Sequence, residues 1–444
     1  MGYEEVVEII LLICCVTIFA GSILLSWKTR FVQIRFLPRL IRMLGRSLWH
    51  KPVSQSDKTI APYKALFAAM STTLGLSTLV APVIAISLGG PGAILGFVVT
   101  SFFGSAATYV EVQLTLHHRR KGKNGIIGGP MPYIQNILSP FFAKAYAFCC
   151  LILVVVWSAA QSNQLAAILD SPMLGAFRIP TYVSGVAIAI IICFVLIGGI
   201  RRVATIASWF VPLLFVLYVG ANLWIVSCNL DRLGSVLMLM VRSMISPYAM
   251  TTGALVGGLF SGLRWGIFKG IQANEAGIGT QTFPHSMVET DPAIDQEILA
   301  MVSTYTAGFV AFLSGVVALL TNTWQDPELS LGLSMVAASF QQYFAEIGIF
   351  LLVFSVLLVA VGTILGNSYN GGKCFEYVTD MRYRTVYFVG TALMLFVGAV
   401  VDAKLLWSRI DIVLACMALI HTTVLLRHLF RSSVVAQKID SRSC

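Results

Sequence analysis

Long apolar runs follow one another along the chain to about residue 430, with short polar segments between them. A helix needs about 20 mostly apolar residues to cross a hydrocarbon core about 30 Å thick. Because the runs are continuously apolar and do not alternate, they predict helices and not the strands of a barrel. We predict an all-α integral membrane protein with about 11 transmembrane helices, over residues 6–27, 62–88, 92–116, 142–168, 181–199, 203–227, 248–281, 296–322, 344–370, 385–402 and 408–427.

Composition supports this class. Of the 444 residues, 57% are hydrophobic and 11% are charged, whereas a soluble protein carries about 25% charged residues. The sequence has no Walker loop, H-E-x-x-H or G-x-S-x-G motif, so we expect neither an enzyme nor ATP-driven transport. The cysteines form no C-x-x-C pair and lie mostly in apolar runs, which favours small core residues over a metal or cofactor site.

Charged residues predict the orientation. Glu4 and Glu5 precede the first run, and Lys28 and Arg30 follow it, so we expect an uncleaved anchor with its N-terminus outside and not a signal peptide. Most of the 30 lysines and arginines then fall on the cytoplasmic side together with the C-terminus, in a cell membrane that we expect to be a bacterial inner membrane. The basic residues are divided among loops, so the net charge of +10 implies no nucleic-acid partner.

Three regions are expected along the chain. Residues 1–60 hold the first transmembrane helix and a basic cytoplasmic segment, residues 61–430 form a ten-helix transporter core, and residues 431–444 form a cytoplasmic tail. In the basic segment, apolar residues at helical spacing are interleaved with arginines. This pattern is typical of a helix lying in the lipid interface, and a plain charged loop is the alternative.

The ten later runs divide into two sets of five, and each set opens with a glycine-interrupted segment, Ser71–Thr78 and Thr251–Gly258. An odd number of spans per set predicts an inverted 5+5 repeat with a broken first helix in each repeat. A helix can break inside a membrane only where the freed N–H and C=O groups meet protein, ion or substrate. Close helix packing through glycines is the alternative explanation.

Two local motifs resemble one family. Ser87–Ala93 and Gly128–Ile134, with Glu111 between them, look like the "GGPGA … E … GGPMYYI" series of the alanine or glycine:cation symporter family, the sodium:alanine symporters. Lys269–Thr280 resembles the "RGLFSNEAGMGSAP" block of that family. The resemblance implies the leucine-transporter-type fold and cation-coupled uptake of alanine and glycine.

The resemblance also implies which residues form the sites. It places the substrate against the first broken helix, opposite the second one and beside the fourth span, at Thr73, Gly75, Leu76, Ser77, Thr78, Gln161, Asn163, Gly257, Gly258, Phe260 and Trp265. Interhelical hydrogen bonding is the alternative role for Gln161 and Asn163.

A coupling cation is expected between the first broken helix and the ninth span, at Ser71, Leu74, Val359, Gly362 and Thr363. Sodium prefers oxygen ligands. Gly362 stands where the family carries a serine or threonine, so one hydroxyl is missing from this site. The chain also lacks the asparagine of the family's "GxGN" motif at Gly75–Thr78.

Charges within the runs are functional candidates, because a charge inside a bilayer is costly. Glu275 shares a run with Arg264 and Lys269 at spacings close to helical turns, which predicts a gating ion pair; solvation of a helix end is the alternative. For Glu111, helix capping or packing explains the position as well as a functional role does.

These observations together favour a secondary active transporter that imports small neutral amino acids with Na⁺. A proton-coupled or uncoupled carrier remains the first alternative. A non-transporting receptor or scaffold on the same fold is the second.

Overall fold

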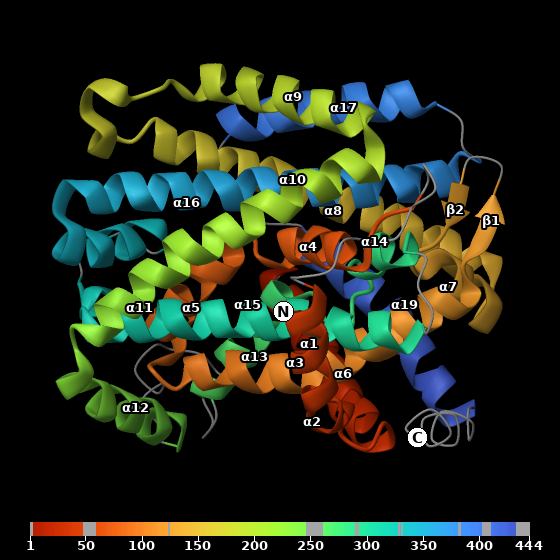
Figure 1. Cartoon of the computed structure of the whole chain (residues 1–444), viewed down its shortest axis with the longest axis horizontal. Coiled ribbons are helices and arrows are strands. Elements are labelled where there is room, and N and C mark those ends of the chain that lie inside the picture. Colours follow the sequence, from red (N-terminus) through yellow and green to blue (C-terminus); the bar gives the residue numbers. More distant parts are fainter. Residues whose placement is uncertain are drawn as a thin grey trace.

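The computed structural model describes residues 3–47, 59–122, 125–245, 261–288, 293–326, 329, 332–380, 383–401 and 410–431, and helices dominate them (Figure 1). The first half contains α1 (Tyr3–Lys28), α2 (Val32–Arg35), α3 (Leu37–Ser47), α4 (Pro62–Thr73), α5 (Leu76–Gly89), α6 (Ala93–His118), α7 (Pro130–Ile137), α8 (Pro140–Leu169), the 3₁₀ helix η1 (Pro172–Phe177), α9 (Thr181–Ile197), α10 (Gly199–Leu214), the π-helical turn η2 (Phe215–Val219), α11 (Gly220–Ser227) and α12 (Leu230–Ile245). The second half contains α13 (Ser261–Asn274), α14 (Thr282–Ser286), α15 (Ala293–Leu320), the 3₁₀ helix η4 (Thr323–Gln325), α16 (Leu333–Val378), α17 (Arg384–Val400) and α19 (Ile410–Arg431). Two three-residue strands, β1 (Arg120–Gly122) and β2 (Gly125–Ile127), pair antiparallel between α6 and α7.

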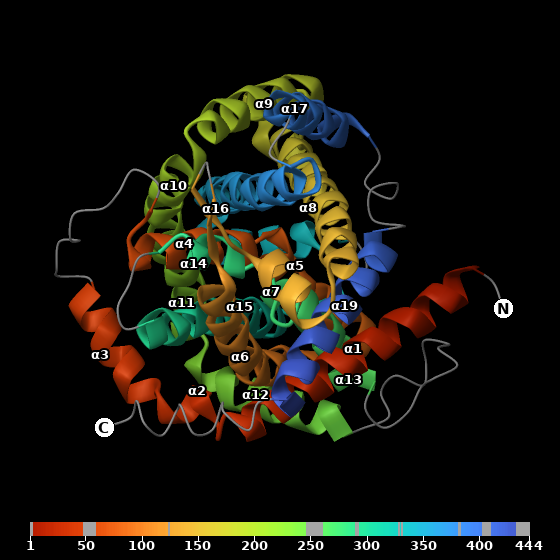
Figure 2. The ribbon, with the colours of Figure 1, turned by 90° about the vertical axis from the view of Figure 1, so that its right-hand side faces the viewer.

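Two groups of helices form the core. The pair α4 and α5 packs with α6, α13 and α15, and α14 touches α4 and α6. In the second group, α8 packs against α16, α17 and α9, and α17 also lies on α9. Figure 2 shows α9 and α17 at one end of the molecule, α6 and α13 toward the other, and α4 and α5 between them. Because α16 also contacts α4 and α5, the first broken helix lies where the two groups meet.

Helices α1 and α19 lie side by side on the outside of the first group and contact α6. The predicted interfacial segment forms α2 and α3. Its Arg39 guanidinium lies 2.7 Å from the carboxylate of Asp295, at the start of α15. The ion pair fixes the basic segment to the core.

Seven helices in the described part of the chain are long and apolar enough to cross a membrane, or eight if the bent pair α4 and α5 is one span. The protein is therefore a multi-pass α-helical membrane protein. Helices α9 and α17 are apolar but shorter, and the predicted run 248–281 is described only from residue 261 onward.

The structure corrects the predicted elements at two places. The segment expected to be a loop after residue 227 forms α12, and several of its apolar side chains, such as Leu230 and Met238, are exposed. The predicted run 344–370 belongs to α16, which starts at Leu333 and has a non-helical backbone at Ala345 (φ 49°, ψ −135°). Hydropathy missed α12 because polar residues interrupt its apolar face, and it missed the kink because Ala345 carries no turn signal.

Candidate functional site

The first break separates α4 from α5 by Leu74 and Gly75, and the two helices meet at an angle of 41°. Three successive hydroxyls before the break, those of Ser71, Thr72 and Thr73, donate to backbone carbonyls three residues earlier. Such bonds compete with the helical N–H groups for the same acceptors. Gly75 then takes an extended backbone (φ −81°, ψ 176°), so the local sequence accounts for the end of α4.

Gln161 of α8 faces this break. The backbone N–H of Leu76 lies 3.4 Å from its Oε1 atom, and a Cβ added at Gly75 would lie 3.3 Å from its Nε2 atom. The hydroxyl of Thr78 donates to the carbonyl of Thr73 at 2.6 Å. The structure therefore brings five residues of the predicted substrate site together: Thr73, Gly75, Leu76, Thr78 and Gln161.

The predicted cation site combines α4 and α16. The Thr363 hydroxyl donates to the carbonyl of Ser71 at 2.9 Å, and a Cβ at Gly362 would lie 3.6 Å from the Ser71 Cβ. Leu74 and Val359 are buried. Two oxygen atoms this close can bind one hard cation together once the hydroxyl turns its proton away. The contact distance at Gly362 is an ordinary one, so a serine there could be accommodated and could add a ligand.

Asn163 does not line the break. Its Nδ2 atom donates to the carbonyls of Gly398 and Val401, at 2.9 and 2.7 Å, and therefore joins α8 to the end of α17. The alternative role, interhelical hydrogen bonding, is the one that the structure shows for this residue. Residues two positions apart on a helix point in different directions, which explains why Gln161 and Asn163 differ.

The other half of the predicted substrate site is only partly described. Gly257, Gly258, Phe260 and the interruption at 251–258 lie outside the described residues. Trp265 is half-buried on α13 and stacks edge-on against Phe268, with ring centroids 6.1 Å apart.

A second break follows α13 and was not predicted at this place. Residues 275–281 are non-helical and fully buried, and three of them have positive φ: Glu275 (52°), Gly277 (85°) and Gly279 (94°). Glycine adopts this conformation without strain, whereas glutamate rarely does. The family-like motif Asn274–Thr280 is thus the unwound part of this segment.

Side chains from three neighbouring helices satisfy the carbonyls that this break frees. Tyr146 of α8 donates to Ile278, His421 of α19 contacts Gly277, and Asn370 of α16 donates to Thr280, at 2.7, 2.8 and 3.3 Å. The amide of Gln281 donates to the carbonyl of Asn274 at 2.7 Å. A non-helical backbone is stable at this depth because these protein groups replace water.

Glu275 contacts hydroxyl groups in the described part of the chain and not the predicted Lys269. The Glu275 carboxylate accepts from the hydroxyls of Thr280, at 2.5 Å, and Thr72, at 3.4 Å. The Lys269 ammonium lies over the Phe268 ring and 3.5 Å from Gln272. The predicted pairing with Arg264 stays a prediction, because that side chain is outside the described residues. Glu275 is buried in the break, so the expectation of a solvated helix end is wrong.

Sequence reasoning missed Asn367, Asn370 and His421. Asn367 lies one turn beyond Thr363 on α16, is 1% exposed, and neither atom of its amide has a hydrogen-bond partner. A buried amide without partners is costly unless a ligand or water completes it. Two asparagines at the end of one apolar run and a histidine within another were the available signal, but neither run alone shows which face these residues share.

Gln161 and Asn163 give a matched test of the two roles. Gln161→Leu is expected to weaken alanine binding about 2- to 10-fold, the effect of one hydrogen bond, with little change in thermal stability. Asn163→Leu is expected to lower the unfolding temperature and leave alanine affinity unchanged. Binding isotherms of the purified variants measure the affinity, and melting curves measure the unfolding temperature. Lower stability in Gln161→Leu together with weaker binding in Asn163→Leu would exchange the two roles.

Comparisons with known proteins identify a family for this chain. The family model for the sodium:alanine symporter family matches residues 3–439. A Haemophilus influenzae protein named only as an uncharacterized transporter is 30% identical, over 89% of this chain and 86% of its own length. The sodium/alanine symporter AgcS of Methanococcus maripaludis is 28% identical, over 91% and 89%. A Bacillus subtilis protein named "Probable sodium/glutamine symporter GlnT" is 27% identical, over 91% and 83%.

Among solved structures, a manganese transporter from Eremococcus coleocola has a similar fold, with a TM-score of 0.51 and 12% identity, over 85% of this chain and 78% of that one. The chain therefore has the leucine-transporter-type fold that the motifs implied. At this identity the likeness concerns the fold and says nothing about the transported substrate. In the described part of the chain, no three His, Cys, Asp or Glu side chains gather where they could hold a metal ion.

Proposed function

Because the chain belongs to the sodium:alanine symporter family, we propose that it imports small neutral amino acids such as alanine and glycine together with Na⁺. The family consists of cation-coupled amino-acid symporters, so the protein is a membrane transporter and not an enzyme. The proposal adds the substrate class, the ion and the residues that bind them.

The first break is the observation that carries the proposal. It offers a backbone N–H at the start of α5, where the positive end of the helix dipole favours a carboxylate. It also offers the carbonyl of Thr73, which a substrate ammonium can take over from the Thr78 hydroxyl. Gln161 closes the site from α8. A zwitterionic amino acid fits these donors and acceptors together.

The cation is proposed to bind beside the substrate, between Ser71 and Thr363, with the carbonyls of Leu74 and Val359 as further oxygen ligands. The contact between α4 and α16 supports this position. An ion held there would join the two groups of helices, so its binding can be linked to the alternating-access movement. The unpartnered Asn367 amide is a candidate ligand within the same face of α16.

We propose the predicted topology for the whole chain. The eight spans, together with α9, α17 and the broken segment α13 to α14, give about 11 crossings. The second broken helix of the inverted repeat is predicted at 251–258, outside the described residues, so the break after α13 is a further interruption in the same run. An outside N-terminus and a cytoplasmic C-terminus in a bacterial cell membrane follow from the basic loops.

The proposed site is tested by binding of labelled alanine to the purified protein at increasing Na⁺ concentrations. Alanine affinity should rise with Na⁺, and glycine should compete. Gly362→Ser, whose Cβ would be in ordinary van der Waals contact with the Ser71 Cβ, adds a hydroxyl beside the proposed ion and should lower the Na⁺ concentration required by about 5-fold or more, equivalent to roughly 1 kcal/mol. Affinity that is independent of Na⁺ in both proteins would favour the proton-coupled or uncoupled alternative. Glutamine binding without alanine binding would refute the substrate class.

A further inference from the structure

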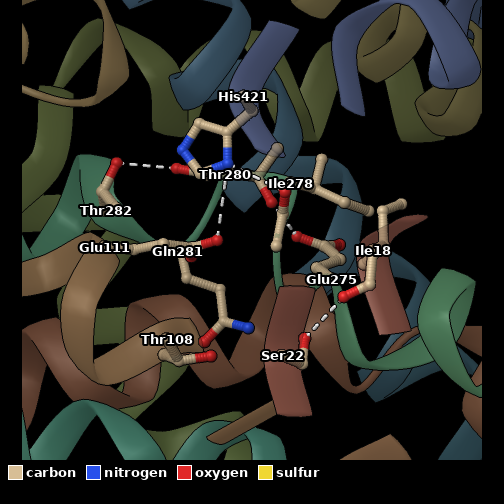
Figure 3. Close-up of polar contacts among 12 residues, drawn as sticks. Ile18, Ser22, Thr108, Glu111, Glu275, Ile278, Thr280, Gln281, Thr282 and His421 are labelled. Atoms are coloured by element: carbon tan, nitrogen blue, oxygen red, sulfur yellow. Dashed lines mark hydrogen bonds and ion pairs between the residues drawn. The ribbon is translucent and has the colours of Figure 1, made fainter. Parts of the chain in front are cut away.

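Glu111 of α6 and His421 of α19 form a buried titratable pair beside the second break (Figure 3). Both side chains are fully buried, and the Nδ1 atom of His421 lies 3.6 Å from Oε1 of Glu111. Neither residue contacts the first break or the proposed cation site in any described interaction. The transport site as proposed does not use them.

The contacts of His421 are compatible with a neutral ring. Its Nδ1 atom is 2.8 Å from the carbonyl of Gly277, which can only accept, so this nitrogen carries a proton. Its Nε2 atom is 2.5 Å from the hydroxyl of Tyr133, which can donate to a neutral ring or accept from a protonated one. A single proton on the ring is enough to satisfy both nitrogens.

The carboxyl group of Glu111 is in the opposite situation. Neither of its oxygen atoms has a hydrogen-bond partner, and the distance to His421 exceeds that of a hydrogen bond. The backbone N–H groups of Gly277 and Gly279 face the carboxyl group, but they are not close or aligned enough for full hydrogen bonds. An ionised carboxylate with only these weak contacts is disfavoured inside a protein within a membrane. A protonated carboxyl carries no net charge and fits this position.

The remaining titratable groups that face the pair do not offer a counter-charge. They are Glu275 from the break, Tyr133 from α7 and Tyr146 from α8. Around Tyr133 and Tyr146 lie His118, Cys150 and Cys374. Helix α1, which also packs here, contributes Ile18 and no titratable group that faces the pair. A second acid, Glu275, makes ionisation of Glu111 still less favourable.

We propose that Glu111 is a proton-binding site of the transporter, with His421 as the positioning residue that ties it to the second break. Glu111 keeps its proton as long as His421 is hydrogen-bonded to the Gly277 carbonyl and the second break excludes water from the carboxyl group. When the break moves, water reaches the carboxyl group and the proton can leave, directly or through His421. The claim that this proton takes part in transport rests on the proposed function. The claim that Glu111 is protonated does not.

The protonation itself is tested by infrared spectroscopy of the full-length protein near neutral pH. Glu111→Gln should remove the carbonyl stretch of one protonated carboxylic acid from the spectrum. Glu376→Gln, which changes a partly exposed carboxylate paired with Lys373, should leave that band unchanged. An unchanged band in Glu111→Gln would mean that Glu111 is ionised and would overturn the proposal.

The link to transport is tested on the unmodified protein, which avoids any folding defect of the variants. Addition of Na⁺ and alanine in weak buffer should move protons between protein and solution, and alanine affinity should change by up to about tenfold per pH unit between about pH 5 and pH 8. Both effects should be lost in Glu111→Gln and kept in Glu376→Gln.

Na⁺-dependent alanine binding, measured in the same samples, separates the two claims. Normal binding without any proton movement would overturn the link between Glu111 and transport and leave the proposed function intact. Absence of Na⁺-dependent alanine binding would contradict the proposed function, while the infrared result would still decide whether Glu111 holds a proton.

Discussion

Thr363→Ala is expected to raise strongly the Na⁺ concentration that alanine uptake requires. The Thr363 hydroxyl lies 2.9 Å from the Ser71 carbonyl, and Gly362 beside it supplies no second hydroxyl. Removal of an oxygen ligand from a site that already lacks one should cost about 1–3 kcal/mol, or roughly 5- to 150-fold in ion affinity. Uptake by proteoliposomes at increasing Na⁺ concentrations measures this loss.

Thr363→Ser is the matched control, because it keeps the hydroxyl and removes only a methyl group. Its sodium dependence should stay close to that of the unmodified protein. Equal loss in both variants would indicate that packing of Thr363 and not its oxygen matters, and unchanged sodium dependence in Thr363→Ala would place the ion elsewhere.

Gly266→Ala is expected to prevent stable packing of α13 on α6. The two helices cross at Gly266 and Gly96, and a Cβ at Gly266 would overlap the Ala93 carbonyl and lie 2.9 Å from the Gly96 Cα. Backbone atoms cannot turn aside as a side chain can, so the helices must separate. Overpacking of this kind costs typically about 1–3 kcal/mol and sometimes more. The melting temperature and the yield of folded protein after extraction should both fall.

Gly220→Ala is the control for this substitution. Gly220 lies in α11, and a Cβ there would meet nothing within 4 Å. This variant should be neutral or stabilised by about 0.5–1 kcal/mol, since alanine is the better helix former. Similar destabilisation of the two variants would show that the α6 to α13 crossing is not as close as described.

The sequence predicted the features that depend on local composition. Apolar runs of sufficient length can only be helices in a membrane, and most of the described spans lie where the runs do. The first break was predicted from Ser71–Thr78 because its causes lie within that segment. They are a glycine, which has no side chain, and hydroxyl groups that donate to backbone carbonyls of the preceding turn.

The second break depends on residues far away in the sequence, and its position was therefore not predicted. The carbonyls of Gly277 and Ile278 are satisfied by His421 and Tyr146, which come from α19 and α8. Only the assembled fold shows that these donors are available. The contact between Glu275 and Thr72 was missed for the same reason: charge spacing along one run suggested Arg264 or Lys269, whereas Thr72 reaches Glu275 from another helix.

The most direct test of sodium-coupled import is uptake of labelled alanine into liposomes that contain the purified full-length protein. With Na⁺ outside and K⁺ inside, alanine should accumulate above its external concentration, and the accumulation should disappear when Na⁺ is equal on both sides. Accumulation driven by a proton gradient without Na⁺, or no accumulation under any ion gradient, would contradict sodium-coupled import.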